Sequence, residues 1–146
     1  MSVATDERYT PEEVYGPLRR LYGFNVDPCT TESNPLGTPV FFTEKDDGLT
    51  REWRVYADYT GSHVFVNPPY SQIKKWAKKA ILEASRGAFV AFLLPNDCST
   101  EAWWLLKAAS WGQWDIPFRV KFGTPVPGEK KDVARSHVVF FLGGLS

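Results

Sequence analysis

The tetrad Asn67-Pro68-Pro69-Tyr70 carries the most specific chemistry in this chain. Consecutive prolines have fixed φ angles and force the residue before each of them into extended geometry, so the Asn67 side chain and the carbonyl groups that follow are held rigidly. Oxygen acceptors beside an aromatic ring suit a substrate whose amino group is attached to an aromatic ring. Acceptors aimed at the N–H bonds localise the nitrogen lone pair, which can then attack an electrophilic methyl group.

In this interpretation the Asn67 amide oxygen and the Pro68 carbonyl oxygen each accept one hydrogen, and Tyr70 stacks on the substrate ring through its ring rather than its hydroxyl. Asn67, Pro68, Pro69 and Tyr70 are therefore the catalytic candidates. The alternative is a tight strand-to-helix turn with a packed tyrosine. The setting favours chemistry, because the apolar run 64–66 precedes the tetrad and an amphipathic helical pattern follows it.

Helical and strand patterns alternate along the rest of the chain. Helices are predicted over residues 11–22, 71–84 and 101–109, the first with Thr10 as its cap and Pro11 at its first position, the third capped by Ser99 or Thr100. Strands are predicted over residues 24–26, 64–66 and 88–94, with a short one at 41–42. The alternating run 118–122 and the apolar run 138–142 predict a closing antiparallel pair.

This order of elements predicts an α/β sandwich around a mostly parallel sheet. Ligands in such folds bind at the carboxyl ends of the parallel strands. Asp27, Asn67 and Pro95 each end a predicted strand, so we expect them to line one rim of the sheet.

Composition bounds the class of protein. A chain of 146 residues with 43% hydrophobic content predicts one compact domain over residues 1–146, with residues 1–8 mobile. No membrane-spanning run or secretory leader is visible, which predicts a soluble cytoplasmic protein that does not bind membranes. Two cysteines and two histidines at unrelated positions predict reduced thiols and no metal. Basic and acidic residues balance at 17 each, so net charge does not indicate nucleic-acid binding, and any such contact has to come from local patches.

Several short motifs follow one another in a recognisable order. They are Tyr9-Thr10-Pro11, Val26-Asp27-Pro28-Cys29, Asp47-Gly48-Leu49, Asn67-Pro68-Pro69-Tyr70 and Leu93-Leu94-Pro95. Together they resemble the small phage-type DNA N6-adenine methyltransferase family (Dam-like), over about Tyr9 to Leu142. The resemblance implies a Rossmann-like sandwich whose last strand is inserted antiparallel. It also implies transfer of the methyl group of S-adenosylmethionine to a flipped-out adenine at specific sites in double-stranded DNA, in a bacterial host cell.

The resemblance also implies a set of cofactor contacts. They are Tyr9, Thr10, Pro11, Asp27, Pro28, Cys29, Phe42, Asp47, Leu49 and Asn67. Asp27 would bind the methionine ammonium group, and Asp47 the adenine amino group or the ribose, with Phe42 or Leu49 against the ring. Thr10 could instead act only as a helix cap, and Asp47 only as a turn residue. The chain departs from larger relatives in one respect, because the turn after the first strand, Asp27-Pro28-Cys29, contains no glycine.

Candidate DNA contacts lie in the segment 123–136, between the two predicted antiparallel strands. Its concentrated cations are Lys130, Lys131 and Arg135, which could reach a phosphate backbone from a hairpin loop or belong to an ordinary exposed loop. The lysines between positions 74 and 79 fit the solvated face of a helix. Trp103, Trp104, Trp111 and Trp114 fit core and helix packing.

Two other classes of function compete with DNA adenine methylation. The first is another amino-group methyltransferase that acts on a protein glutamine or an RNA guanine, although such families usually carry a glycine-rich turn and accessory domains. The second is a non-catalytic DNA-binding relative that has kept the fold. The intact tetrad speaks against the second class.

Overall fold

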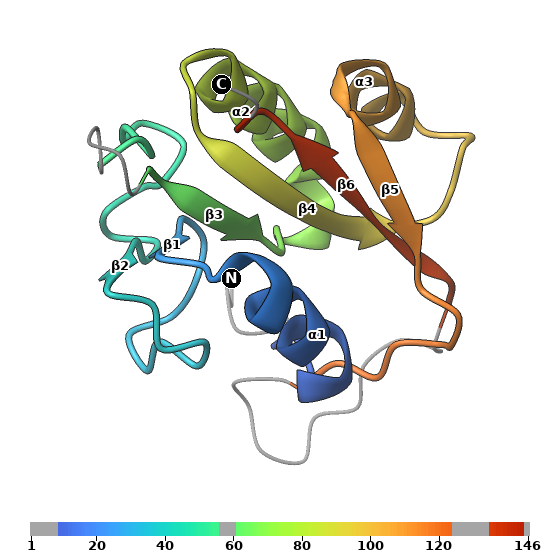
Figure 1. The fold of residues 1–146 in the computed structure, drawn as a ribbon, viewed down its shortest axis with the longest axis horizontal. Coiled ribbons are helices and arrows are strands. Elements are labelled where there is room, and N and C mark those ends of the chain that lie inside the picture. Colours follow the sequence, from blue (N-terminus) through green and yellow to red (C-terminus); the bar gives the residue numbers. More distant parts are fainter. Residues whose placement is uncertain (1–8, 56–60, 124–134, 145–146) are drawn as a thin grey trace.

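A six-stranded sheet forms the centre of the molecule (Figure 1). The computed structural model describes residues 9–55, 61–123 and 135–144. The strands are β1 (Val26–Asp27), β2 (Val40–Phe41), β3 (His63–Val66), β4 (Phe89–Pro95), β5 (Gly112–Asp115) and β6 (His137–Leu142). They lie in the order β2-β1-β3-β4-β6-β5. The first four are mutually parallel, and β6 runs antiparallel to both of its neighbours. The predicted α/β class with a mostly parallel sheet is confirmed.

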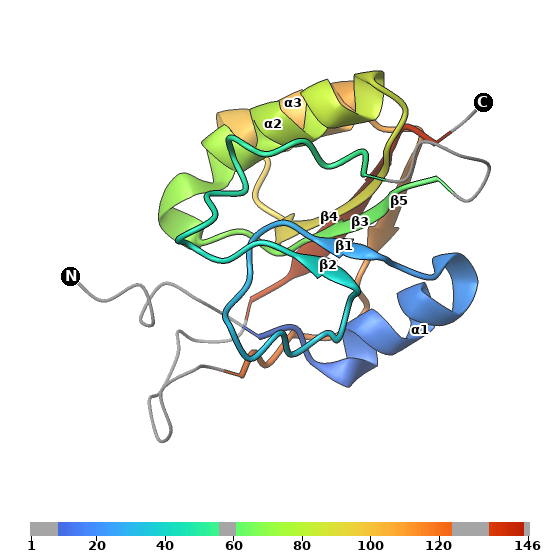
Figure 2. The same cartoon turned by 90° about the vertical axis from the view of Figure 1, so that its left-hand side faces the viewer.

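Helices cover the sheet on both faces. The helices are α1 (Glu12–Tyr22), α2 (Ile73–Ser85), which follows the short 3₁₀ turn η2 (Tyr70–Gln72), and α3 (Glu101–Ala109). Helices α2 and α3 lie side by side on one face, and α1 lies on the other (Figures 1 and 2). This arrangement explains why every residue of β4 is buried: alternate side chains enter the core under α2 and α3 or the core under α1.

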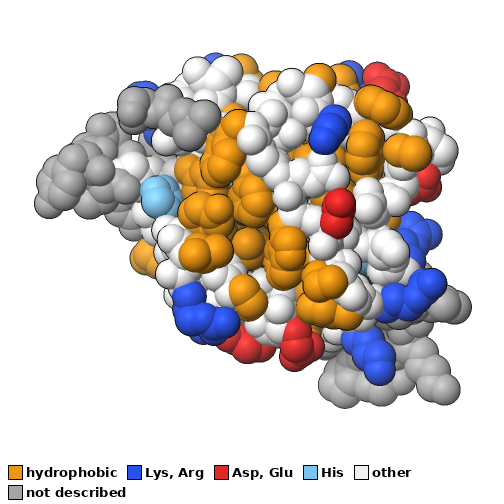
Figure 3. All heavy atoms as spheres, turned by 45° about the vertical axis from the view of Figure 1, so that its right-hand side comes forward, with side chains coloured by type: hydrophobic (Ala, Val, Ile, Leu, Met, Phe, Trp, Pro, Cys, Tyr) orange, Lys and Arg blue, Asp and Glu red, His pale blue; other side chains and the backbone are white. Residues whose placement is uncertain are grey.

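The α1 face of the sheet is less completely covered. When the view of Figure 1 is turned so that its right-hand side comes forward, hydrophobic side chains form a continuous band on the surface (Figure 3). The ring of Trp111 is 44% exposed and packs on Phe89 and Phe141, and Trp104 on α3 is 57% exposed. Trp103 instead packs edge-on against Phe140 with the ring centroids 5.4 Å apart. Packing therefore accounts for the tryptophans only in part.

The predicted strand at 118–122 is wrong. None of these residues belongs to a strand, and Phe118 is 40% exposed whereas Val120 is buried. The strand that pairs with β6 is β5, which lies earlier in the chain. With β4 on one side and β5 on the other, β6 has no free edge left for residues 118–122. The sequence of β5, Gly-Gln-Trp-Asp, has little strand propensity, which is why its pattern was missed.

The start of α1 also differs from the prediction. The helix begins at Glu12, and Pro11 rather than Thr10 is its N-cap, with no side-chain cap hydrogen bond. The Pro11 carbonyl accepts the backbone N–H groups of Val14 and Tyr15. Thr10 is thereby free of the capping role that its sequence position suggested. Thr100, by contrast, caps α3 as predicted, with its hydroxyl accepting the Trp103 N–H at 3.4 Å.

The lysine face of α2 is as predicted except at one position. Lys74, Lys75 and Lys78 are exposed, but the side chain of Lys79 is only 12% exposed. It lies 2.7 Å from the carboxylate of Glu83, which is fully buried. The second Glu83 oxygen accepts the backbone N–H of Trp53 at 3.0 Å. The buried Glu83 carboxylate therefore pairs with Lys79 within α2 and, through the Trp53 N–H, ties α2 to the loop that precedes β3.

Candidate active site

The carboxyl ends of β1, β3 and β4 meet at one rim of the sheet, as predicted. Val26 of β1 is aligned with Val64 of β3, and Val66 of β3 with Phe92 of β4. Asp27, Asn67 and Pro95 therefore come to the same edge from adjacent strands.

Asn67 is held from two directions. Its side-chain nitrogen donates to the Thr10 hydroxyl at 3.0 Å, and its backbone carbonyl accepts a hydrogen bond from the Cys29 thiol at 3.4 Å. Because the nitrogen is directed at Thr10, the amide oxygen points away from Thr10. Pro68, the next residue, is buried. The rigid acceptor predicted from the tetrad thus gains an anchor that the sequence pattern did not reveal, since the threonine expected to cap α1 orients the catalytic candidate.

A small hollow lies on the Asp27 side of Asn67. Its lining comprises Tyr9, Thr10, Asp27, Cys29, Thr30, Pro35, Leu36 and Asn67. Five of these residues belong to the predicted set. The Asp27 carboxylate is 4% exposed and accepts the Cys29 backbone N–H at 3.4 Å. Burial, and then the nearby Asp27 carboxylate, raise the pKa of Tyr15, a residue of the adjoining core, to about 12.

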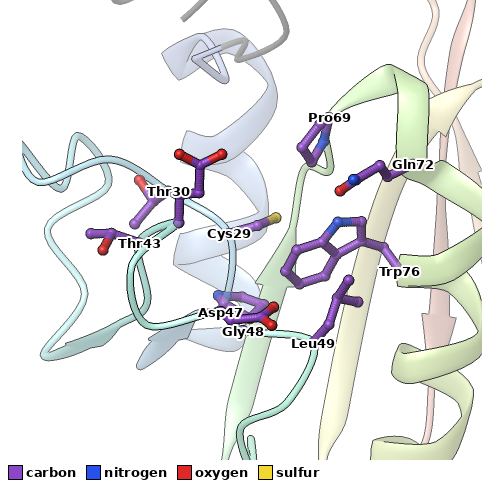
Figure 4. Close-up of a pocket in the computed structure, with 11 residues that line it drawn as sticks. Cys29, Thr30, Thr43, Asp47, Gly48, Leu49, Pro69, Gln72 and Trp76 are labelled. Atoms are coloured by element: carbon purple, nitrogen blue, oxygen red, sulfur yellow. The ribbon is translucent and has the colours of Figure 1, made fainter. Parts of the chain in front are cut away.

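A second hollow adjoins the first and shares Cys29 and Thr30 with it. Its lining comprises Pro28, Cys29, Thr30, Thr43, Glu44, Asp47, Gly48, Leu49, Pro69, Gln72 and Trp76. The indole ring of Trp76 lies beside Leu49, and the loop carrying Thr43 and Asp47 forms the opposite wall (Figure 4). Together the two hollows make a trough that runs from Thr10 to Trp76 along the ends of β1 and β3.

The two neighbouring aspartates of the loop have different tasks. Asp46 accepts hydrogen bonds from the Thr43 backbone N–H at 2.9 Å and from its hydroxyl, and these bonds, the backbone bond first, lower the pKa of its carboxyl group. Asp47 has a φ of 56° and lines the trough. Asp46 therefore closes the turn, whereas Asp47 is the residue placed to meet a ligand.

Gly48 allows this loop to approach the strand end closely. A side chain there would collide with the Pro28 carbonyl oxygen, so only glycine fits. The Gly48 carbonyl accepts the Trp53 indole N–H at 2.9 Å, and the Trp53 backbone is in turn held by buried Glu83. One wall of the trough is thereby fastened to α2.

A third hollow, of about 500 Å³, lies on the other side of the tetrad. It is lined by Tyr70, Ser71, Ile73, Lys74, Leu94, Pro95, Asp97, Thr100, Glu101, Ala102 and Arg135. The Tyr70 hydroxyl lies 2.6 Å from His137 Nε2, and the guanidinium carbon of Arg135 lies 5.8 Å from the centre of the Tyr70 ring. The tetrad therefore stands between the trough and a hollow that carries its aromatic ring.

Some predicted residues lie away from these hollows. Phe42 packs against the core and under the guanidinium group of Arg51, and Pro11 serves as the helix cap. Lys130 and Lys131 lie outside the described residues, as do residues 1–8. Arg135 is described, and it contacts the tetrad.

Sequence reasoning missed two residues in particular. Trp76 lies on the apolar face of the predicted helix 71–84, a position that by itself indicates only packing, yet it also lines the trough. His137 gives no signal in the sequence, because the two histidines of the chain lie at unrelated positions. For Trp76 a signal existed, since a helix that starts directly after the tetrad places its first buried turns beside it.

Two features are absent from the part of the chain that the structure describes. Across residues 9–55, 61–123 and 135–144, no group of three or more His, Cys, Asp or Glu side chains is placed to hold a metal ion. Within the same ranges, no helix is long and apolar enough to cross a bilayer.

Known proteins with similar sequences point to one family. The family model described as DNA N-6-adenine-methyltransferase (Dam) matches residues 2–139. A DNA N-6-adenine-methyltransferase from Escherichia phage T1 is 35% identical over 95 residues, which cover 64% of this chain. The aligned part amounts to 37% of that relative's length, so this chain spans well under half of it.

Proposed function

Because the chain belongs to the DNA N-6-adenine-methyltransferase (Dam) family, we propose that it transfers the methyl group of S-adenosylmethionine to the exocyclic amine of adenine in double-stranded DNA. The observation that carries the proposal is the placement of Asn67. Its amide is oriented by Thr10 at the point where the trough meets the hollow that holds Tyr70. We assign the sheet, with β6 inserted antiparallel between β4 and β5, to the Rossmann-like methyltransferase sandwich, with residues 1–146 as one domain.

The trough fits S-adenosylmethionine chemically. The buried Asp27 carboxylate suits the methionine ammonium group, with Tyr9 and Thr10 beside it. Asp47 suits the adenine amino group or the ribose hydroxyls, and Leu49 and Trp76 offer apolar walls for the ring. The indole nitrogen of Trp76 has no hydrogen-bond partner among the described residues, so this wall keeps an unused donor. No glycine-rich turn is needed, because the loop at Gly48 closes over the strand end instead.

When bound, S-adenosylmethionine supplies an electrophilic methyl group. The residues of the chain align and polarise the amine that attacks it. The Asn67 amide oxygen and the Pro68 carbonyl accept its hydrogens, which localises the nitrogen lone pair. Both acceptors are held before the substrate arrives, so little reorganisation is needed in the transition state. No histidine or cysteine base is required, since the amine becomes acidic as the methyl group is transferred.

The hollow beside Tyr70 suits a base taken out of the duplex. In a duplex the target amine is base-paired, so the adenine has to leave the stack before it can reach Asn67. A hollow of about 500 Å³ with an aromatic ring in its wall can receive a flipped base. The cytoplasm of a bacterial host, where phage and host DNA are accessible, is the proposed place of action.

The test is direct. Purified protein is incubated with S-adenosylmethionine carrying a labelled methyl group and with DNA from a host that lacks adenine methylation, and the DNA is digested and analysed for N6-methyladenine. RNA and protein substrates run in parallel, and one reaction contains a chelator. Label on adenine, insensitive to chelator, is the expected result. Label on RNA or protein but not on DNA would overturn the substrate, and loss of activity with chelator would overturn the metal-free mechanism.

A further inference from the structure

A hydrogen bond joins the tetrad to the last strand of the sheet. Tyr70 lies in the turn after β3, and His137 is the first residue of β6, two strands away. Their side chains meet over the end of β4, where His137 is aligned with Pro95. The distance between the Tyr70 hydroxyl and His137 Nε2 is 2.6 Å, which is short for a hydrogen bond between neutral groups.

The other ring nitrogen of His137 determines the direction of this bond. Nδ1 lies 2.9 Å from the backbone carbonyl oxygen of Arg135, and a carbonyl can only accept. Nδ1 therefore carries the proton in the neutral ring. Nε2 is then the acceptor, and the Tyr70 O–H donates to it.

The bond is enclosed by aromatic packing. His137 is 2% exposed, and the ring of Phe122 packs edge-on against both partners, with centroids 4.9 Å from His137 and 6.4 Å from Tyr70. Shielding from water strengthens the hydrogen bond and leaves few other orientations to the Tyr70 ring. Arg135, whose carbonyl orients His137, also places its guanidinium group over the Tyr70 ring.

We propose that His137 is a positioning residue for Tyr70: it accepts the phenol hydrogen and thereby sets the angle at which the tyrosine ring faces the hollow beside the tetrad. The proposal rests on the proposed function in so far as that ring stacks on the target base. It also changes the expectation for the tyrosine hydroxyl. Stacking needs only the ring, but the orientation of the ring depends on the hydroxyl.

The bond itself can be tested without activity. The chain has only two histidines, so the ¹⁵N spectrum of the protein labelled on histidine contains two imidazole rings. Tyr70→Phe removes the donor and is expected to shift the Nε2 resonance of His137. The His63 ring, which contacts the carbonyls of Tyr22 and Gly23, is the internal reference and is expected to stay in place. An unmoved His137 resonance would overturn the proposal.

The positioning role is tested by kinetics on unmethylated DNA. Tyr70→Phe and His137→Leu should each raise the KM for DNA by roughly fivefold, on the scale of one net hydrogen bond, and leave the Kd for S-adenosylmethionine unchanged. The KM for DNA of the double variant should be no higher than that of the more impaired single variant, because both changes remove the same hydrogen bond. His137→Gln, which keeps an acceptor near the position of Nε2, should recover part of the loss. Tyr22→Phe, on the last turn of α1 and outside the three hollows, is the matched control.

The outcomes separate this proposal from the function on which it rests. If the wild-type protein leaves DNA unmethylated, the proposed function fails, and the role of His137 in base positioning fails with it. If the wild type is active and the effects of Tyr70→Phe and His137→Leu add independently, the function stands and the positioning role is wrong. If His137→Leu does not fold, Tyr70→Phe still tests the proposal, because it removes the same hydrogen bond by deleting a single oxygen.

Discussion

The two sides of Asn67 are stabilised in different ways. The trough on one side is lined mainly by residues between 27 and 49, and its loop wall is held by buried Glu83, which binds both Lys79 and the Trp53 backbone. The hollow on the other side is bordered by Tyr70 and Arg135, with the exposed ion pair of Lys74 and Glu101 at its edge. Both ion pairs involve α2 and have similar lengths, 2.7 Å and 2.8 Å, yet only the first is buried.

This difference suggests that the two sides of Asn67 serve different ligands. Groups buried against a fixed backbone keep their geometry whether or not a ligand is present, which suits a site for a small cofactor of constant shape. Exposed charges such as those of Lys74 and Glu101 can rearrange at low cost, which suits the entry of a base that arrives from a duplex. The following changes test the comparison, from the largest expected effect to the smallest.

Removal of the buried Glu83 carboxylate should lower the free energy of unfolding more than any other change considered. Glu83→Ala leaves the largely buried Lys79 ammonium without this partner and the Trp53 N–H without an acceptor, so the free energy of unfolding should fall by about 3 kcal/mol or more. Glu101→Ala, at the exposed pair, should change it by less than about 1 kcal/mol. Urea denaturation of the two variants provides the measurement. Equal losses of unfolding free energy in the two variants would show that burial does not make the Lys79–Glu83 pair more important than the Lys74–Glu101 pair.

Asn67→Ala should have the largest effect on catalysis. It removes the acceptor that strengthens as the amine changes geometry, so turnover should fall by roughly a hundredfold or more, whereas cofactor affinity should change far less. Thr10→Val is the matched variant, because it removes the anchor of the amide and keeps the amide oxygen. Its loss of turnover should be smaller. Near-normal turnover in Asn67→Ala would rule out the acceptor role.

Gly48→Ala should weaken the trough selectively. The added methyl group collides with the Pro28 carbonyl and pushes the loop that carries Asp47 away from the strand end. The Kd for S-adenosylmethionine, measured by calorimetry, should rise by about tenfold, the loss of roughly one favourable contact. Gly112→Ala on β5 is the control, because its Cβ meets only the Phe141 ring edge at 3.3 Å. An unchanged Kd in Gly48→Ala would remove this loop from the cofactor site.

The smallest effect per residue is expected at the cations proposed to meet phosphates. Replacing Lys130, Lys131 and Arg135 together with Ala should raise the Kd for DNA and flatten its dependence on salt, because fewer counterions are released. Cofactor affinity and thermal stability should remain close to wild type. An unchanged salt slope would move the DNA contact to the exposed lysines of α2.

Much of the fold was predictable because burial repeats along regular elements. The apolar run of β4 and the amphipathic pattern of α2 predicted both elements to within a few residues, and the turn chemistry after β1 and β3 predicted the rim. The strand prediction for residues 118–122 was wrong because an alternating pattern forms a strand only where a sheet edge is available to pair with it. The capping role predicted for Thr10 was wrong because that prediction uses only neighbouring residues, whereas the partner of Thr10, Asn67, is 57 residues away.

The sequence by itself determined the tetrad, the family and most of the strands and helices, because these depend on residue types and on contacts between neighbours in the chain. The tertiary structure alone decided what holds the tetrad in place. Thr10 meets Asn67 and His137 meets Tyr70 only because β1, β3, β4 and β6 align their ends at one rim. A hydrogen bond between distant residues depends on the register of whole strands, and that register is fixed only when the strands pair in the folded sheet.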